Sequence, residues 1–246
     1  MNKADVAPKA RRFYETVRVG EAEQGGFSVL LDGRAARTPG ANALALPTPE
    51  LAQLVAAEWL AQGDTLNWGT MPATRLAGVA IDGGHAGRDR ATQIIGDYAS
   101  SDLICYFAPF PKALVARQAE VWGPILEWAR QSRGLDFRSV TGVIHQAQPA
   151  TTLANLTEIL MATDDFTLAG LALGASLFGS AILALALAAA RVDGAAAVAA
   201  ARLDELFQEG QWGRDAESDR RAQALAHDAQ MLEGWFAALS QPLCGA

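Results

Sequence analysis

The sequence has few of the residues that build disulfide frameworks and metal sites, with two cysteines and three histidines among its 246 residues. Cys105 and Cys244 form no Cys-x-x-Cys pair, so we expect neither a disulfide framework nor a zinc site, and a reducing compartment suits the chain. His85, His145 and His227 are scattered, and none belongs to a His-Glu-x-x-His motif. The sequence therefore predicts no metal site.

Positive charge is also scarce, because 20 lysines and arginines face 27 aspartates and glutamates, which gives a net charge of −7. Nucleic-acid binding depends largely on clustered lysine and arginine side chains, so a nucleic-acid partner is disfavoured. An acidic surface also repels anionic lipid. We therefore expect the partner to be a protein or a small molecule.

Nucleotide-binding and targeting motifs are missing as well. The sequence has no G-x-x-x-x-G-K-[ST] loop, and no G-x-G-x-x-G follows a strand pattern. The amino-terminal stretch MNKADVAPKARRFYETVRV carries positive charges with no apolar run behind them, unlike a secretory signal. The missing signal predicts a cytoplasmic protein.

The hydropathy pattern changes along the chain. Half of the residues are hydrophobic, which is enough for a large core. The amino-terminal part has strand-like patterns, and Asp32-Gly33 is a strong hairpin signal between two of them. Helical spacing then takes over, and past residues 106–111 it continues to the end. We predict an α+β fold, with a small β-containing amino-terminal domain at 1–108 and an all-α carboxy-terminal domain at 109–246.

A long apolar run, DDFTLAGLALGASLFGSAILALALAAARVD, contains no charged residue from Phe166 to Ala190. About 20 apolar residues suffice to span a membrane, and GLALG is a G-x-x-x-G motif of the kind found in membrane helix pairs. A helix that is apolar on every side also occurs at the centre of large soluble proteins. Amphipathic segments follow the run, and no basic cluster or Trp and Tyr belt flanks it, which favours one central buried helix capped by Thr163. A single membrane span at 166–190 is the alternative.

Catalytic signals are weak. GASLFG resembles a nucleophile elbow with one residue too many, and Ser176 within it is more simply a packing residue. His227-Asp228 lies on a helical face that we expect to be solvated. An enzyme whose site assembles from dispersed residues, with Asp102, His145 or His227 involved, is a second alternative.

Two further positions are expected to be structural. Trp59 lies at helical spacing from Leu51 and Val55, so we assign it to the core. Arg75 and Asp82 are two helical turns apart, too far for a direct pair, so each is expected to bond elsewhere in the domain interface.

The segment from Ala199 to Glu209 has two different faces at helical spacing. The apolar face holds Ala199, Leu203, Leu206 and Phe207, and the polar face holds Glu205, Gln208 and Glu209, with Asp204 at the edge. Trp212 follows between two glycines, where it is either a core residue or a contact residue.

Five segments together are more specific than any single motif. They are FSVLLDGRAARTP, MPATRLAGVAID, DLICYF, RQAEVWGPILEW and ARLDELFQEGQWGRDAESDRR. In these segments and in their order, the sequence resembles the assembly chaperones that attend the α subunit of the F-type ATP synthase catalytic sector. The resemblance covers residues 11–236, nearly the whole chain.

This resemblance implies a two-domain protein without enzymatic activity or cofactor, whose client is the free α subunit, shielded until its β partner arrives. We expect a monomer in the bacterial cytoplasm, which corresponds to the mitochondrial matrix of eukaryotic relatives. The apolar run matches the family's Gly-Ser-x-x-x-Ala-x-Ala helix at Gly179-Ser180, which lies in the soluble helical domain. The sequence departs from the family pattern at Leu60 and Gly123, where acids are expected. These departures put in doubt any functional role of the loops that we expect the two residues to occupy.

A surface that holds a subunit until its true partner displaces it should be moderate in size and partly polar. We predict that this surface lies at the start of the last motif. Its residues are Asp204, Glu205, Gln208, Trp212, Asp215 and Glu217. The acids among them are expected to form an electronegative surface that engages basic residues of the client.

Overall fold

The chain divides into two compact units. The computed structural model describes residues 10–23, 25–213 and 216–240. The two units are Met1–Asp82 with Ala238–Ala246, and Gly83–Ala237. A small sheet in the first unit and helices in the second confirm the α+β fold. The division falls before α3 (Gly84–Ser100). The sequence predicted a domain boundary at 108, and that boundary stays a prediction.

The first unit contains a four-stranded antiparallel sheet centred on β2 (Phe27–Leu31). The other strands are β1 (Val17–Glu21), β3 (Arg34–Ala35) and β4 (Ala45–Leu46), each paired with β2. Asp32 and Gly33 form the turn between β2 and β3 with φ angles of 49° and 80°, which confirms the hairpin signal. The Asp32 carboxylate accepts hydrogen bonds from the main-chain nitrogens of Thr16 and Glu15, which lower its pKa and fix the approach to β1.

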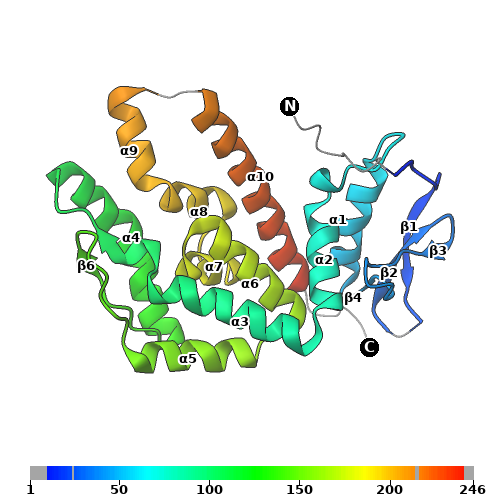
Figure 1. Ribbon diagram of the computed structural model, residues 1–246, viewed down its shortest axis with the longest axis horizontal. Coiled ribbons are helices and arrows are strands. Elements are labelled where there is room, and N and C mark those ends of the chain that lie inside the picture. Colours follow the sequence, from blue (N-terminus) through cyan, green and yellow to red (C-terminus); the bar gives the residue numbers. More distant parts are fainter. Residues whose placement is uncertain (1–9, 24, 214–215, 241–246) are drawn as a thin grey trace, which may run out of the picture. The chain divides into compact units, whose positions relative to one another are not determined.

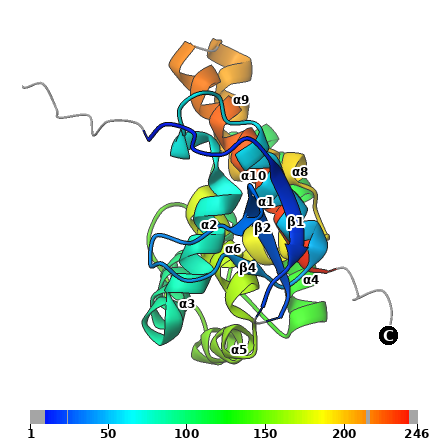
Figure 2. The same cartoon turned by 90° about the vertical axis from the view of Figure 1, so that its right-hand side faces the viewer.

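Helix α1 (Pro49–Leu60) packs against β1 and β2 (Figure 2). Thr48 caps its first turn by accepting a hydrogen bond from the Leu51 main-chain nitrogen at 3.2 Å. Trp59, near the end of the helix, is buried, and the Tyr14 hydroxyl donates to its carbonyl oxygen at 2.7 Å. The assignment of Trp59 to the core is therefore confirmed.

Helix α2 (Pro72–Asp82) follows the 3-10 helix η1 (Trp68–Thr70), and a carboxylate fixes its first turn. Glu58 accepts hydrogen bonds from the main-chain nitrogens of Ala73 and Thr74 at 2.7 Å each. Burial raises the pKa of Glu58 although these donors favour its charged form. The carboxylate supplies a cap that the helix cannot provide itself, because Met71, the residue before it, has no capping side chain.

The carboxylate of Asp82 fixes the other end of α2. It accepts hydrogen bonds from the Thr38 hydroxyl at 2.6 Å, and from the Gly40 main-chain nitrogen and the Asn42 amide at 2.8 Å each. Asp82 thus bonds inside the first unit rather than at a domain interface. Among the described residues, Arg75 makes no hydrogen bond or ion pair, so the expectation that it bonds in a domain interface is wrong.

In its described residues, the second unit is mainly helical, with one short parallel strand pair. After α3 come η2 (Leu103–Cys105), β5 (Tyr106–Phe107), α4 (Lys112–Arg133), β6 (Val140–Thr141), α5 (Ala150–Met161), α6 (Asp165–Phe178), α7 (Ala181–Ala188), α8 (Gly194–Ala201), α9 (Leu203–Trp212) and α10 (Ala216–Leu239). Strands β5 and β6, of two residues each, pair in parallel, and β6 lies within the part of the chain predicted to be helical. Helix α7 lies in the middle and packs against α3, α4, α6 and α8 (Figure 1).

The apolar run is buried within this unit, as predicted, but it forms two helices instead of one. Gly179 ends α6 in the left-handed conformation with φ 65°, which glycine adopts without strain. Ser180 then caps α7, and every residue from Ala181 to Leu187 is buried. No helix in the described part of the chain is both long and apolar enough to cross a membrane.

A buried carboxylate fixes the start of α7. Asp102 has no exposed surface, and it accepts hydrogen bonds from the Ser180 hydroxyl at 2.6 Å and from the Ile182 main-chain nitrogen at 3.0 Å. The Ser180 oxygen accepts in turn from the Leu183 nitrogen at 3.0 Å. Burial raises the pKa of Asp102 to about 7 although these donors act in the opposite direction. Asp102 therefore satisfies donors of a helix end that lies wholly inside the protein.

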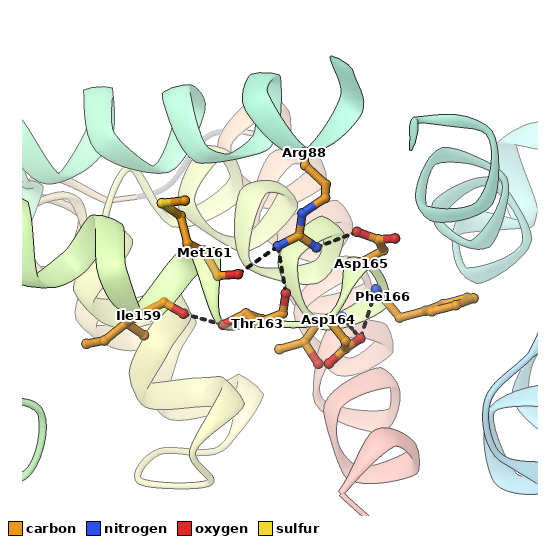
Figure 3. A network of polar contacts seen from close by, with 8 residues as sticks. Arg88, Ile159, Met161, Thr163, Asp164, Asp165 and Phe166 are labelled. Atoms are coloured by element: carbon orange, nitrogen blue, oxygen red, sulfur yellow. Dashed lines mark hydrogen bonds and ion pairs between the residues drawn. The ribbon is translucent and has the colours of Figure 1, made fainter. Parts of the chain in front are cut away.

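The start of α6 is fixed from α3 by Arg88 (Figure 3). Its guanidinium donates to the carbonyl oxygens of Met161 at 3.1 Å and Thr163 at 2.9 Å, and forms an ion pair with Asp165. The cap of α6 is Asp164, which accepts from the main chain of the first turn, and not Thr163 as predicted. One cation thus joins the end of α5 to the start of α6.

The G-x-x-x-G motif of the run serves packing inside the protein. A β-carbon at Gly170 would lie 2.9 Å from the ring of Phe236, and one at Gly174 would lie 3.0 Å from the β-carbon of Ala184. These distances are shorter than van der Waals contact, so both positions need glycine for α6 to approach α7 and α10.

Candidate functional site

The predicted binding segment bends at Arg202, where α8 ends and α9 begins. Trp122 of α4 donates its indole N–H to the Ala200 carbonyl oxygen at 3.0 Å, and Leu203 is buried at the start of α9. The continuous helix that we expected from Ala199 to Glu209 is therefore wrong. The bend turns α9 away from the apolar centre of the unit (Figure 1).

Arg202 links the two helices of the site. Its Nε donates to the Glu205 carboxylate at 2.9 Å and its Nη2 to the Glu209 carboxylate at 2.6 Å. The Ser218 hydroxyl of α10 donates to the same Glu209 oxygen at 2.6 Å. The side chains of Arg202 and Glu209 are 10% and 12% exposed, so Glu209 is turned inward and does not belong to the solvated face as expected. Burial lowers the pKa of the Arg202 guanidinium, and the two carboxylates outweigh that effect.

Sequence reasoning missed Arg202. The sequence did contain a signal for its ion pairs. Residues three and seven positions apart lie on the same side of a helix, and this is the spacing of Arg202 to Glu205 and to Glu209. The contact with α10 was not visible, since Ser218 lies beyond the residues at 214–215 that separate the two helices.

Asp204 positions α9 against α4. The side-chain amide of Gln118 donates to the Asp204 carboxylate at 2.7 Å, and the Gln118 oxygen accepts from the Ala108 main-chain nitrogen at 2.8 Å. Gln118 has no exposed surface. Of the six predicted contact residues, Asp204 is thus half-buried and already bonded within the unit.

Three of the predicted residues line one open cleft. Glu205, Gln208 and Trp212 face a cleft of about 670 Å³ whose other wall includes Leu225 of α10. Trp212 is 78% exposed, so it is not a core residue. A tryptophan held at that exposure is suited to bind a partner, because large aromatic side chains contribute strongly at interfaces.

The charges around this cleft have both signs. Glu217 on α10 is exposed and lies 3.9 Å from Arg221, which also lines the cleft. The Glu205 carboxylate is 67% exposed and shares Arg202 with Glu209. Asp215 lies outside the described residues. The surface is therefore a mixed polar surface around an aromatic side chain, and the expected acids do not stand alone.

The residues of the enzyme alternative are not brought together by hydrogen bonds in the described part of the chain. Asp102 bonds to the start of α7, whereas the Nδ1 of His145 lies 3.2 Å from the Tyr106 hydroxyl near the surface. His227 is exposed on α10. Each of these residues has a separate environment, and the Ser180 hydroxyl that pairs with Asp102 is wholly buried at the start of α7, where no substrate reaches it.

Comparisons with known proteins agree with this architecture. Residues 11–130 match the model of the ATP12 chaperone protein family. The structure of Atp12 from Paracoccus denitrificans has 38% identity and a TM-score of 0.85, covering 93% of this chain and 98% of that chain. A mutant of the same protein matches equally, with 97% of its chain covered. A candidate chaperone from Agrobacterium tumefaciens has 40% identity and a TM-score of 0.87, covering 94% and 86% of the two chains.

The chain belongs to the ATP12 chaperone family. The family model ends before α5, whereas the matched structures extend over more than nine-tenths of the chain. The two departures from the family pattern lie in helices, not in loops as expected: Leu60 ends α1 and Gly123 lies inside α4. A β-carbon at Gly123 would meet nothing within 4 Å, so the glycine is not needed for packing there.

Proposed function

We propose that this ATP12-family chaperone binds the free α subunit of the F-type ATP synthase catalytic sector and shields it until the β subunit pairs with it. The observation that carries the proposal is the open cleft between α9 and α10, where Trp212 is exposed among polar groups. Family membership supports a chaperone role. We further propose that the protein acts as a monomer in the cytoplasm and catalyses no reaction.

The physical need for such a protein follows from ring assembly. A ring subunit exposes two interfaces while it is alone, and apolar surfaces of several hundred Å² lead to aggregation. The chaperone must cover such a surface and still be displaced by the correct partner. A mixed-charge cleft with one exposed tryptophan fits this need, because rim charges act mainly on the rate and selectivity of association.

The six predicted residues have different proposed roles. Trp212 would fill a pocket of the client, while Glu205 and Gln208 would contact polar groups around it. Asp204 would act by holding α9 on α4. Glu217 would contribute from α10, and Asp215 is proposed from the sequence alone.

The proposal is tested by copurification of the purified chaperone with the isolated α subunit. We expect a stable complex with α alone and its loss when purified β is added in excess, since both proteins compete for the client. A chaperone that ignores α, or that stays bound after β has joined, would contradict the proposal. Assay of ATP hydrolysis by the purified chaperone tests the enzyme alternative, and we expect no activity above buffer.

A further inference from the structure

The first unit contains an apolar groove that the proposed function does not use. It has a volume of about 660 Å³ and lies between α2, the segment that begins at Ala10 and the loop before Leu44. Its rim exposes large apolar side chains: Phe13 is 70% exposed, Val79 62% and Trp68 45%. Such a concentration of exposed apolar side chains on one side of a small unit is typical of a binding surface.

The aromatic side chains of the groove are held in place. The Arg12 main-chain nitrogen donates to the Asp64 carbonyl oxygen at 2.9 Å, and the Arg12 guanidinium donates to the Gln62 carbonyl oxygen at 2.6 Å. Tyr14 is buried, and the ring of the exposed Phe13 meets the Tyr14 ring edge-on, with centroids 5.4 Å apart at 83°. These contacts orient the Phe13 ring at the surface, and an oriented side chain loses less entropy on binding.

Trp68 is fixed in the same way. Its ring meets the ring of the buried Trp59 edge-on, with centroids 5.8 Å apart at 88°. The Gly69 main-chain nitrogen donates to the side chain of Asn67, which caps the short helix η1. The groove thus presents two oriented aromatic rings with Val79 of α2 as a third apolar element.

The charges of the groove favour an acidic occupant. Arg37 and Arg75 line it. The carboxylate of Asp82 also lines it, but this carboxylate already accepts three hydrogen bonds from the loop at 38–42. Arg37 donates one hydrogen bond, to the Ala41 carbonyl oxygen. Arg75 makes none with the described residues, although its charge stabilises the ionised form of the nearby Glu58 carboxylate. Both guanidinium groups can therefore still donate hydrogen bonds to an occupant of the groove.

We infer that this groove binds a second segment of the client, one in which a bulky apolar side chain is followed closely by a carboxylate. The inference rests on the proposed function, because it takes the α subunit as the client. A polypeptide fits this groove better than a small molecule. Pockets for small molecules usually bury most of the ligand surface. A small ligand that contacted the exposed Phe13 and Val79 at the rim would remain largely in water. The chaperone then holds its client through two separate surfaces, which raises affinity through effective concentration.

The test measures the affinity of the full-length chaperone for purified α subunit with two matched pairs of variants. Val79→Asp is paired with Met161→Asp, because both are apolar side chains exposed on helices, at 62% and 71%, and Met161 does not line the groove. Arg75→Glu is paired with Arg18→Glu, since Arg18 is an exposed arginine of β1 outside the groove. Circular dichroism and urea unfolding confirm that each variant is folded.

We expect Val79→Asp and Arg75→Glu to weaken binding about tenfold or more, and the two control variants to stay within about twofold of the unchanged protein. If all four variants bind α equally well while the unchanged protein forms the complex, the groove inference fails and the proposed function stands. If the unchanged protein does not bind α, both fail. Oleate serves as the small-molecule probe: binding of oleate in the groove without any effect of Val79→Asp on α binding would also overturn the inference.

Discussion

The second unit contains two consecutive helix pairs that are built in opposite ways. Helices α6 and α7 are apolar, and α7 is buried over nearly its whole length. Helix α9 and the amino-terminal part of α10 are largely polar, and both line an open cleft. In both places one buried ionic group at a helix start holds the geometry: the Asp102 carboxylate for α7 and the Arg202 guanidinium for α9.

The difference shows how the unit separates stability from binding. The first pair gains its free energy from the removal of apolar surface from water, which requires that nothing of it be exposed. In the second pair, hydrogen bonds and ion pairs of polar side chains fix the position of an exposed surface. Substitutions of buried residues in the first pair should therefore change folding, and substitutions of exposed residues in the second should change binding.

The strongest test of this separation places an acid in each pair. Leu183→Asp puts a carboxylate into α7, where the side chain has no exposed surface. We expect it to cost about 5 kcal/mol or more, enough to prevent folding of most domains. Trp212→Asp in α9 should change the free energy of unfolding by ~0.5 kcal/mol or less, because that side chain is 78% exposed. Urea unfolding measures both, and equal losses at the two positions would contradict the comparison.

Removal of Arg202 should have the next largest effect. Arg202→Ala removes the guanidinium that pairs with the Glu209 carboxylate, which is 12% exposed. We expect a loss of about 3 kcal/mol in the free energy of unfolding. Hydrogen exchange should become faster in α9 while α7 keeps its protection. The control is Arg202→Ala combined with Glu209→Ala, which should cost less than the sum of the two single changes, and strict additivity would show that the pair is not coupled.

The pH dependence of Asp102 separates its contribution from the rest of the first pair. Its pKa is raised by burial from 3.8 to about 7, so between these values the folded state holds a proton that the unfolded state releases. The contribution is therefore fully present below pH 3.8 and is lost as the pH rises through 7. Asp102→Asn does not titrate. The advantage of the unchanged protein over this variant should fall by about 2 kcal/mol from pH 5.5 to pH 8, measured by urea unfolding, and a constant difference would refute the shifted pKa.

The sequence predicted the features that depend on neighbouring residues. The Asp32-Gly33 turn, the burial of the apolar run and the core position of Trp59 all followed from local spacing. The break at Gly179-Ser180 did not, although both residues were singled out as part of a family motif. A Gly-Ser pair inside an apolar run ends a helix only if other groups satisfy the freed donors and acceptors. Here that group is a carboxylate 78 positions away, at Asp102.

The candidate site was predicted in its location but not in its geometry. Helical spacing placed Glu205 and Gln208 on one face, and both line the cleft. The same spacing could not show that Gln118 of α4 bonds to Asp204, or that Glu209 turns inward to Arg202. Such contacts depend on the packing of distant helices, which amphipathic patterns leave open.

The smallest expected effect tests the second pair by itself. Glu205→Lys reverses a charge on a side chain that is 67% exposed, so the loss of its pair with Arg202 should cost ~1 kcal/mol or less of stability. Binding of the isolated α subunit should weaken about tenfold, because the lysine would meet the basic groups that we expect on the client. Glu158→Lys is the matched control, since Glu158 is an exposed acid of α5 that does not line the cleft. If Glu205→Lys unfolds the protein, or if Glu158→Lys weakens binding as much, then the net charge of the chaperone and not this cleft determines its hold on the client.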